Sequence, residues 1–161
     1  MSTLLYREAS EAAQVVEAQL RRNRDVAEKL GAQLRQHPPR AVLTCARGSS
    51  DHAATYGKYL LETRTGAIVA SAAPSVSSVY AARQDFAGCL FLAISQSGRS
   101  PDLVESARAA RAAGAVVVAL VNVEDSPLAA EADHLFALGG GVERSVAASK
   151  SFIAALSALL Q

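Results

Sequence analysis

Apolar residues recur at three- and four-residue intervals through the first 36 positions of the chain. The stripe runs from Leu4 to Leu34 and predicts amphipathic helix, with a solvated bend or charged face at residues 21–24. Pro38 and Pro39 then end the helical pattern, because proline cannot continue a helix and restricts the residue before it. We therefore expect residues 1–36 to form an N-terminal helical segment.

Beyond residue 37, short apolar runs of strand length alternate with helical patterns. Strands are predicted over residues 41–45, 67–71, 90–94, 115–121 and 134–138. Helices are predicted over residues 51–64, 74–83, 101–113, 126–132 and from 146 to the end. Apolar strands separated by helices require a parallel sheet covered on both faces. The predicted fold class is α/β: a three-layer α/β/α sandwich with a roughly five-stranded parallel sheet, preceded by the helical segment.

Charge and composition narrow the range of partners. The 161 residues include 16 Lys+Arg and 15 Asp+Glu, so a net charge of +1 offers no electrostatic footprint for nucleic acid or an anionic membrane. The longest apolar run of interest, residues 115–121, is far shorter than the ~20 residues of a membrane span. Cys45 and Cys89 lie inside apolar runs, which indicates buried thiols and favours the cytoplasm.

Three loops that lead from a predicted strand towards a helix combine glycine with serine: residues 46–51, 95–100 and 139–146. Ligands of open parallel sheets bind at such loops, where glycine allows close approach and helix N-termini present free N–H groups. The pattern predicts a phosphate site without lysine. The alternative is that Ser50 or Asp51, and Ser100, only cap the helices that follow.

Four segments resemble the sugar isomerase (SIS) domain family. Residues 94–102 (ISQSGRSPD) and 46–50 (ARGSS) match its phosphate loops, residues 143–150 (ERSVAASK) match its third segment, and residues 121–128 match its N-V-x-x-S-x-L stretch. The resemblance is to the isomerase half of glutamine:fructose-6-phosphate amidotransferase and to two-SIS-domain glucosamine-6-phosphate deaminases. It implies this substrate-binding set, with the valine against the sugar: Gly48, Ser49, Ser50, Ser95, Gln96, Ser97, Ser100 and Val146. Arg47 stands where the family has cysteine and Arg99 where it often has glutamate, so two extra guanidiniums would suit an anionic ligand.

The family pattern also suggests what this sequence lacks. Ser2 replaces the nucleophilic cysteine that opens a glutaminase half, so the sequence resembles the shorter relatives with two SIS domains. Residues 37–161 are expected to form a single SIS domain, the N-terminal one, cut before a second SIS domain, because the last helix reaches Gln161 without a cap. In the family the acid–base groups come from that second domain or its tail.

No catalytic residue is therefore assigned. By residue type Glu143, Lys150 and His52 are candidates for proton transfer, but a helix-start carboxylate favoured by the dipole is the better interpretation of Glu143, and an ion pair of Lys150. No metal and no cofactor are predicted.

The function expected is sugar-phosphate binding, with hexosamine 6-phosphate and fructose 6-phosphate as ligands. The chain would belong to an aldose–ketose isomerase, deaminase or aminotransferase-type enzyme, as a homodimer or in association with a second SIS domain. A non-catalytic sugar-phosphate sensor is the alternative, and an inert half-domain would need the serines to be caps only.

Overall fold

Five strands form one parallel sheet in the computed structural model, which describes residues 3–161. The strands are β1 (Val42–Ala46), β2 (Val69–Ser71), β3 (Leu90–Ser95), β4 (Val116–Val121) and β5 (His134–Ala137). They lie in the order β2-β1-β3-β4-β5, and every neighbouring pair is parallel. The predicted five-stranded parallel sheet is confirmed.

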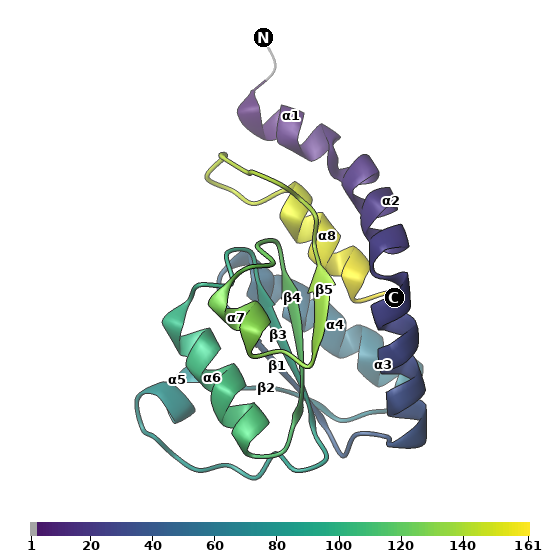
Figure 1. Cartoon of the computed structure of the whole chain (residues 1–161). Coiled ribbons are helices and arrows are strands. Elements are labelled where there is room, and N and C mark those ends of the chain that lie inside the picture. Colours follow the sequence, from purple (N-terminus) through teal and green to yellow (C-terminus); the bar gives the residue numbers. More distant parts are fainter. Residues whose placement is uncertain (1–2) are drawn as a thin grey trace.

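Helices cover both faces of this sheet (Figure 1). The helices are α1 (Leu4–Ser10), α2 (Ala12–Arg22), α3 (Arg24–Gln36), α4 (Ser49–Thr65), α5 (Pro74–Ser78), α6 (Pro101–Ala112), α7 (Pro127–Ala130) and α8 (Lys150–Ala158). Helices α2, α3, α4 and α8 pack on one face, and α5, α6 and α7 on the other. The three-layer α/β/α sandwich is thereby confirmed.

The hydrophobic core has two parts, one on each face of the sheet. The strands contribute side chains to both parts, because successive side chains of a strand point to opposite faces. In β3, Leu92 and Ile94 face the layer of α2, α3, α4 and α8, whereas Phe91 and Ala93 face the layer of α6. All six residues of β3 are buried. This two-sided burial is why the strands are apolar throughout instead of alternating with polar residues.

The N-terminal apolar stripe forms three helices, with breaks at Glu11 and Asn23. The break at Asn23 lies inside the predicted bend and places its side chain on the edge strand β5. The buried Asn23 amide donates to the backbone carbonyl of Ala137 and accepts from its N–H, both at 3.1 Å. These two bonds satisfy edge-strand groups that would otherwise stay unpaired.

Two predicted helices have different ends in the structure. The last helix begins at Lys150 instead of Val146, because the Glu143 carboxylate accepts the N–H groups of Ser149 and Lys150 and caps the helix there. Helix α5 ends at Ser78, and the chain then turns through Ala81, which has a positive φ of 47°. In the described part of the chain no helix is both long and apolar enough to cross a membrane.

Candidate functional site

A polar pocket of about 250 Å³ lies beyond the carboxyl ends of β1 and β3. The strand order reverses between these two strands, and such switch points are where open α/β sheets bind ligands. The pocket is lined by Arg47, Ser49, Ser50, Ile94, Ser95, Gln96, Ser97, Ser100, Val146 and Ala148. Every residue of the predicted binding set except Gly48 is thus brought to one place.

The turn from β1 to α4 presents two serines at a helix N-terminus. Gly48 has φ 58° and occupies the cap position of α4, so Ser49 and Ser50 are the first two residues of the helix. Because Gly48 has no side chain, α4 is not capped by a hydroxyl. The capping interpretation of Ser50 and Asp51 is therefore wrong, and Ser49 and Ser50 both line the pocket.

The loop from β3 to α6 is stabilised by bonds within itself. The Ser95 hydroxyl, which is buried, accepts the N–H of Gly98 at 3.0 Å, and the Ser97 hydroxyl accepts the N–H of Arg99 at 3.2 Å. Ser100 occupies the cap position of α6 but makes no capping hydrogen bond. A capping hydrogen bond therefore does not explain Ser100, which lines the pocket at a helix N-terminus.

The segment between β5 and α8, which contains the third loop (residues 139–146), is held by groups from distant parts of the chain. The Asn122 side chain accepts from Gly140 N and donates to Gly141 O, both at 2.7 Å. The buried Glu8 carboxylate of α1 accepts the N–H of Arg144 at 2.6 Å and of Ser145 at 3.1 Å. Figure 1 shows α1 beside this loop, drawn in yellow-green between β5 and α8. These contacts fix the segment that carries Val146.

Glu143 is fully engaged at the start of α8. Its carboxylate accepts from Ser149 N at 2.7 Å, Lys150 N at 2.9 Å and the Ser151 hydroxyl, and Gln96 Nε2 donates to it at 3.1 Å. Burial raises the pKa of Glu143, but the hydrogen bonds from the first residues of α8 outweigh it and hold the pKa below its ordinary value. The geometry favours the helix-start role over a general base.

The other two candidates for proton transfer lie outside the pocket lining. Lys150 is buried, and its Nζ lies 2.6 Å from Glu11 Oε2, so the predicted ion pair is present. His52 lies exposed in the first turn of α4. Neither residue lines the pocket.

One guanidinium adds positive charge to the pocket. Arg47 lines it and forms an ion pair with Asp102, in the first turn of α6. Arg99 is exposed and is not part of the lining, so only one of the two extra arginines lies at the site. Serine hydroxyls, two helix N-termini and a guanidinium together suit a phosphate group.

Two further kinds of chemistry bear on the site: metal binding by side chains and nucleophilic attack by a thiol. Within residues 3–161 no group of three or more His, Cys, Asp and Glu side chains is arranged to hold a metal ion. Burial raises the pKa of the Cys45 thiol to about 11, so it stays protonated and a poor nucleophile.

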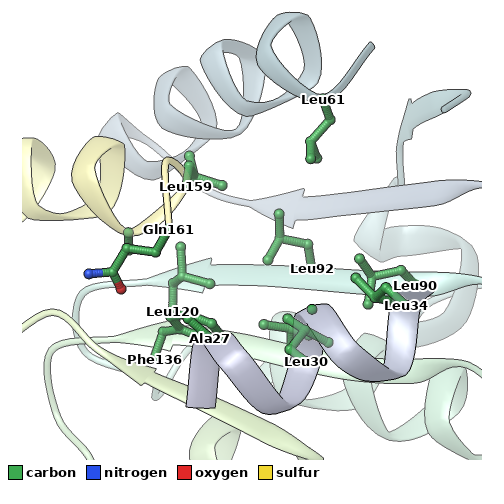
Figure 2. Close-up of a pocket in the computed structure, with 13 residues that line it drawn as sticks. Ala27, Leu30, Leu34, Leu61, Leu90, Leu92, Leu120, Phe136, Leu159 and Gln161 are labelled. Atoms are coloured by element: carbon green, nitrogen blue, oxygen red, sulfur yellow. The ribbon is translucent and has the colours of Figure 1, made fainter. Parts of the chain in front are cut away.

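A second, apolar pocket of about 180 Å³ lies between α3, α4, the end of α8 and the sheet (Figure 2). Leu30 and Leu34 of α3 face Leu92 of β3 across it, and Gln161 contributes the polar side chain of the lining. Such a lining cannot orient a sugar phosphate, which needs several polar groups. The serine-lined pocket is therefore the better candidate.

Sequence reasoning missed the groups that position the third loop. Asn122 belongs to the N-V-x-x-S-x-L stretch, so the motif pointed to it without giving its role. Glu8 carried no signal, because a glutamate in an amphipathic helix is expected to face water. The Arg47–Asp102 pair could be suspected only once the two loops were known to meet.

Comparisons with known proteins bear on the family and on the fold. A family model described as SIS domain matches residues 37–161. Glutamine–fructose-6-phosphate aminotransferase from Helicobacter pylori is 38% identical over 111 residues, which are 69% of this chain and 18% of the relative. The chain thus spans about a fifth of the length of such curated relatives.

Two solved structures share the fold over nearly the whole chain. A Silicibacter pomeroyi protein provisionally named a phosphosugar isomerase superposes with a TM-score of 0.95 at 43% identity, covering 99% of this chain and 49% of that one. The C-terminal domain of glucosamine-fructose-6-phosphate aminotransferase from Francisella tularensis gives 0.83 at 27% identity, covering 99% and 46%. This chain spans about half of each.

Proposed function

The chain belongs to the SIS domain family, and we propose that its serine-lined pocket binds the phosphate of a hexose or hexosamine 6-phosphate. One observation carries the proposal: Ser49, Ser50 and Ser100 lie at two helix N-termini around one pocket, and none of their hydroxyls makes a capping hydrogen bond. A phosphate between α4 and α6 would accept from these hydroxyls and from the free N–H groups of both helix starts.

The sugar ring would extend towards the third loop. Val146 is fully exposed and lines the pocket with Ala148, opposite the serine loops. An apolar side chain there offers contact to a sugar face, while Gln96 at the pocket offers an amide to a hydroxyl. Fructose 6-phosphate and glucosamine 6-phosphate are the ligands that fit the amino-sugar enzymes among the relatives.

The chemistry that follows binding would need groups from outside this chain. Aldose–ketose isomerisation requires a carboxylate that moves a proton between two carbons. Glu143 caps α8 and Lys150 pairs with Glu11, so neither is free for that step. Because the chain spans about half of its solved relatives, we place the acid–base groups in a second SIS domain or a second copy of this chain. The enzyme would be a cytoplasmic isomerase, deaminase or aminotransferase of amino-sugar metabolism.

A sugar-phosphate sensor is the second candidate. The contacts of Glu143 with α8 and of Lys150 with Glu11 favour it as much as they favour an enzyme whose acid–base groups lie elsewhere. The two functions differ in turnover once a second SIS domain is supplied. Production of fructose 6-phosphate and ammonia from glucosamine 6-phosphate by the joined domains supports the enzyme. Binding of glucosamine 6-phosphate without turnover supports the sensor. Turnover by the 161-residue chain alone, at rates near those of its full-length relatives, would contradict the placement of acid–base groups outside it.

A thermal-shift titration tests the binding proposal directly. Glucosamine 6-phosphate and fructose 6-phosphate should raise the melting temperature, and unphosphorylated glucosamine should not. At 100 times its Kd a ligand adds about 2.7 kcal/mol of stability. Ser49→Ala and Ser100→Ala should weaken the shift without lowering the melting temperature of the free protein, because neither hydroxyl caps a helix.

Ser78→Ala provides the matched control. Its hydroxyl is exposed on α5, donates to Pro74 O at 2.9 Å and does not line the pocket. The control should keep the full shift. Equal shifts in all three variants would mean that the serine loops do not hold the phosphate.

A further inference from the structure

Arg47 lines the pocket, and most of its guanidinium N–H groups make no bond within the described residues. It lies on the turn after β1, and its side chain is 66% exposed. The recorded contact of its guanidinium, within residues 3–161, is the ion pair from Nη2 to Asp102. A guanidinium has five N–H donors, so most of them remain available to the pocket that Arg47 lines.

Asp102 explains why a positive charge is needed there. Its carboxylate sits in the first turn of α6, only 20% exposed, and one oxygen accepts the N–H of Leu103 at 3.0 Å. A carboxylate stabilises a helix N-terminus, but it also repels an anion bound at that same terminus. A phosphate at Ser100 would meet this repulsion, because Asp102 follows Ser100 by two residues at the start of the same helix.

We propose that Arg47 is a specificity-determining residue, which neutralises Asp102 and makes the pocket select a doubly charged phosphate ester over singly charged anions of the same shape. The inference rests on the proposed function, because it assumes that the serine-lined pocket holds the phosphate. Hydroxyls and backbone N–H groups recognise the shape of a tetrahedral anion, whereas the guanidinium responds to its charge.

The proposal predicts that affinity depends on the charge of the ligand. A merely structural role of Arg47 would change the affinity for a phosphate ester and for a sulfate ester equally. Glucose 6-phosphate and glucose 6-sulfate have nearly the same shape, but the phosphate carries close to two charges above its second pKa of about 6 and the sulfate carries one. Isothermal titration of the full chain at about pH 7.5 should show tighter binding of the phosphate. Arg47→Ala should weaken phosphate binding by about tenfold to a hundredfold and sulfate binding by less.

Asp102→Asn completes a double-mutant cycle. Alone, it should leave phosphate binding equal or tighter, because it removes the repelling charge. Added to Arg47→Ala, it should restore a part of the lost affinity. Arg99→Ala is the matched control, since this neighbouring arginine does not line the pocket, and it should change the affinity less than twofold.

The outcomes separate the two levels of the proposal. If the unmodified chain binds neither ester, the proposed function fails, and the role of Arg47 fails with it. If the unmodified chain binds the phosphate and Arg47→Ala behaves like Arg99→Ala, only the role of Arg47 is overturned. Arg47→Gln, which keeps the length of the side chain without its charge, must also lose the preference for phosphate over sulfate, and an unchanged preference overturns the proposal.

Discussion

Replacing Gly98 with alanine should distort the loop between β3 and α6 far more than the positive φ of this residue alone requires. Gly98 has φ 62° and lies buried between Ser95 and Ser100. A Cβ atom placed on it would lie 2.5 Å from the Cβ of Ser126 and still closer to its hydroxyl. Ser126 is itself buried and caps α7 through a 3.4 Å bond from Ala129 N, so it cannot move aside without loss.

The magnitude follows from a comparison with Gly66. That glycine ends α4 with φ 72° and has open space where a Cβ would be, so Gly66→Ala carries the conformational cost alone, roughly 1–2 kcal/mol. Gly98→Ala adds overpacking, which costs roughly 1–3 kcal/mol. The free energy of unfolding should therefore fall by about 2–5 kcal/mol for Gly98→Ala, the sum of both costs.

Guanidinium denaturation of the two variants measures the difference in stability, and the thermal shift with glucosamine 6-phosphate measures the effect on the site. The shift should survive in Gly66→Ala and be lost or strongly reduced in Gly98→Ala, because the collision displaces the loop that carries Ser97 and Ser100. Two variants of equal stability, both with the full ligand shift, would refute the argument that the Gly98–Ser126 approach shapes this loop.

Three further outcomes are expected. Asn23→Ala should lower the free energy of unfolding by about 3 kcal/mol in urea, because it leaves two buried groups of Ala137 unpaired, and a loss near zero would contradict this role. The backbone hydrogen bond from Arg144 and the hydroxyl bond from Ser145 lower the pKa of Glu8, so its stabilisation is complete above about pH 4.3 and disappears as the pH falls through the lowered folded pKa. Glu8→Gln should therefore lose stability near neutral pH and show a flatter decline in acid, which melting curves across that range would reveal. Native Cys45 should resist iodoacetamide at about pH 8, since its pKa is about 11. Labelling at Cys45 itself without denaturant, located by mass spectrometry apart from the half-buried Cys89, would show that the Cys45 thiol is accessible.

The sheet and two of the three site loops could be predicted from local sequence. The strands are continuous apolar runs because both faces of the sheet are covered, and each was found within one or two residues of its observed start. The loops after β1 and β3 follow from the same pattern, since parallel strands place their carboxyl ends at one edge. The sequence alone therefore predicts that the serines of these two loops lie close together.

The third loop could not be predicted in the same way, because its conformation depends on partners far along the chain. Glu8 and Arg144 are separated by 136 positions, and no periodicity links them. The start of α8 was misplaced by four residues for a related reason, since a carboxylate at Glu143 ends the irregular segment at Ser149. Helix propensity alone does not predict this cap, because Glu143 lies six residues before Ser149, whose N–H it accepts.

These two modes of support divide the pocket into halves of different origin. The half proposed to hold the phosphate is formed by hydrogen bonds that span two or three residues, such as the bond from Gly98 N to the Ser95 hydroxyl. The half proposed to contact the sugar is held by Glu8 of α1, which accepts from residues 144 and 145, and by Asn122, which bonds the glycines before them. Under the proposed function, a sugar phosphate would meet a phosphate cradle fixed by local geometry and a sugar contact, at Val146, fixed by tertiary packing. The proposed function therefore predicts that substitutions that loosen α1 change the affinity for the sugar part of the ligand, whereas substitutions in the serine loops weaken the binding of every phosphate ester.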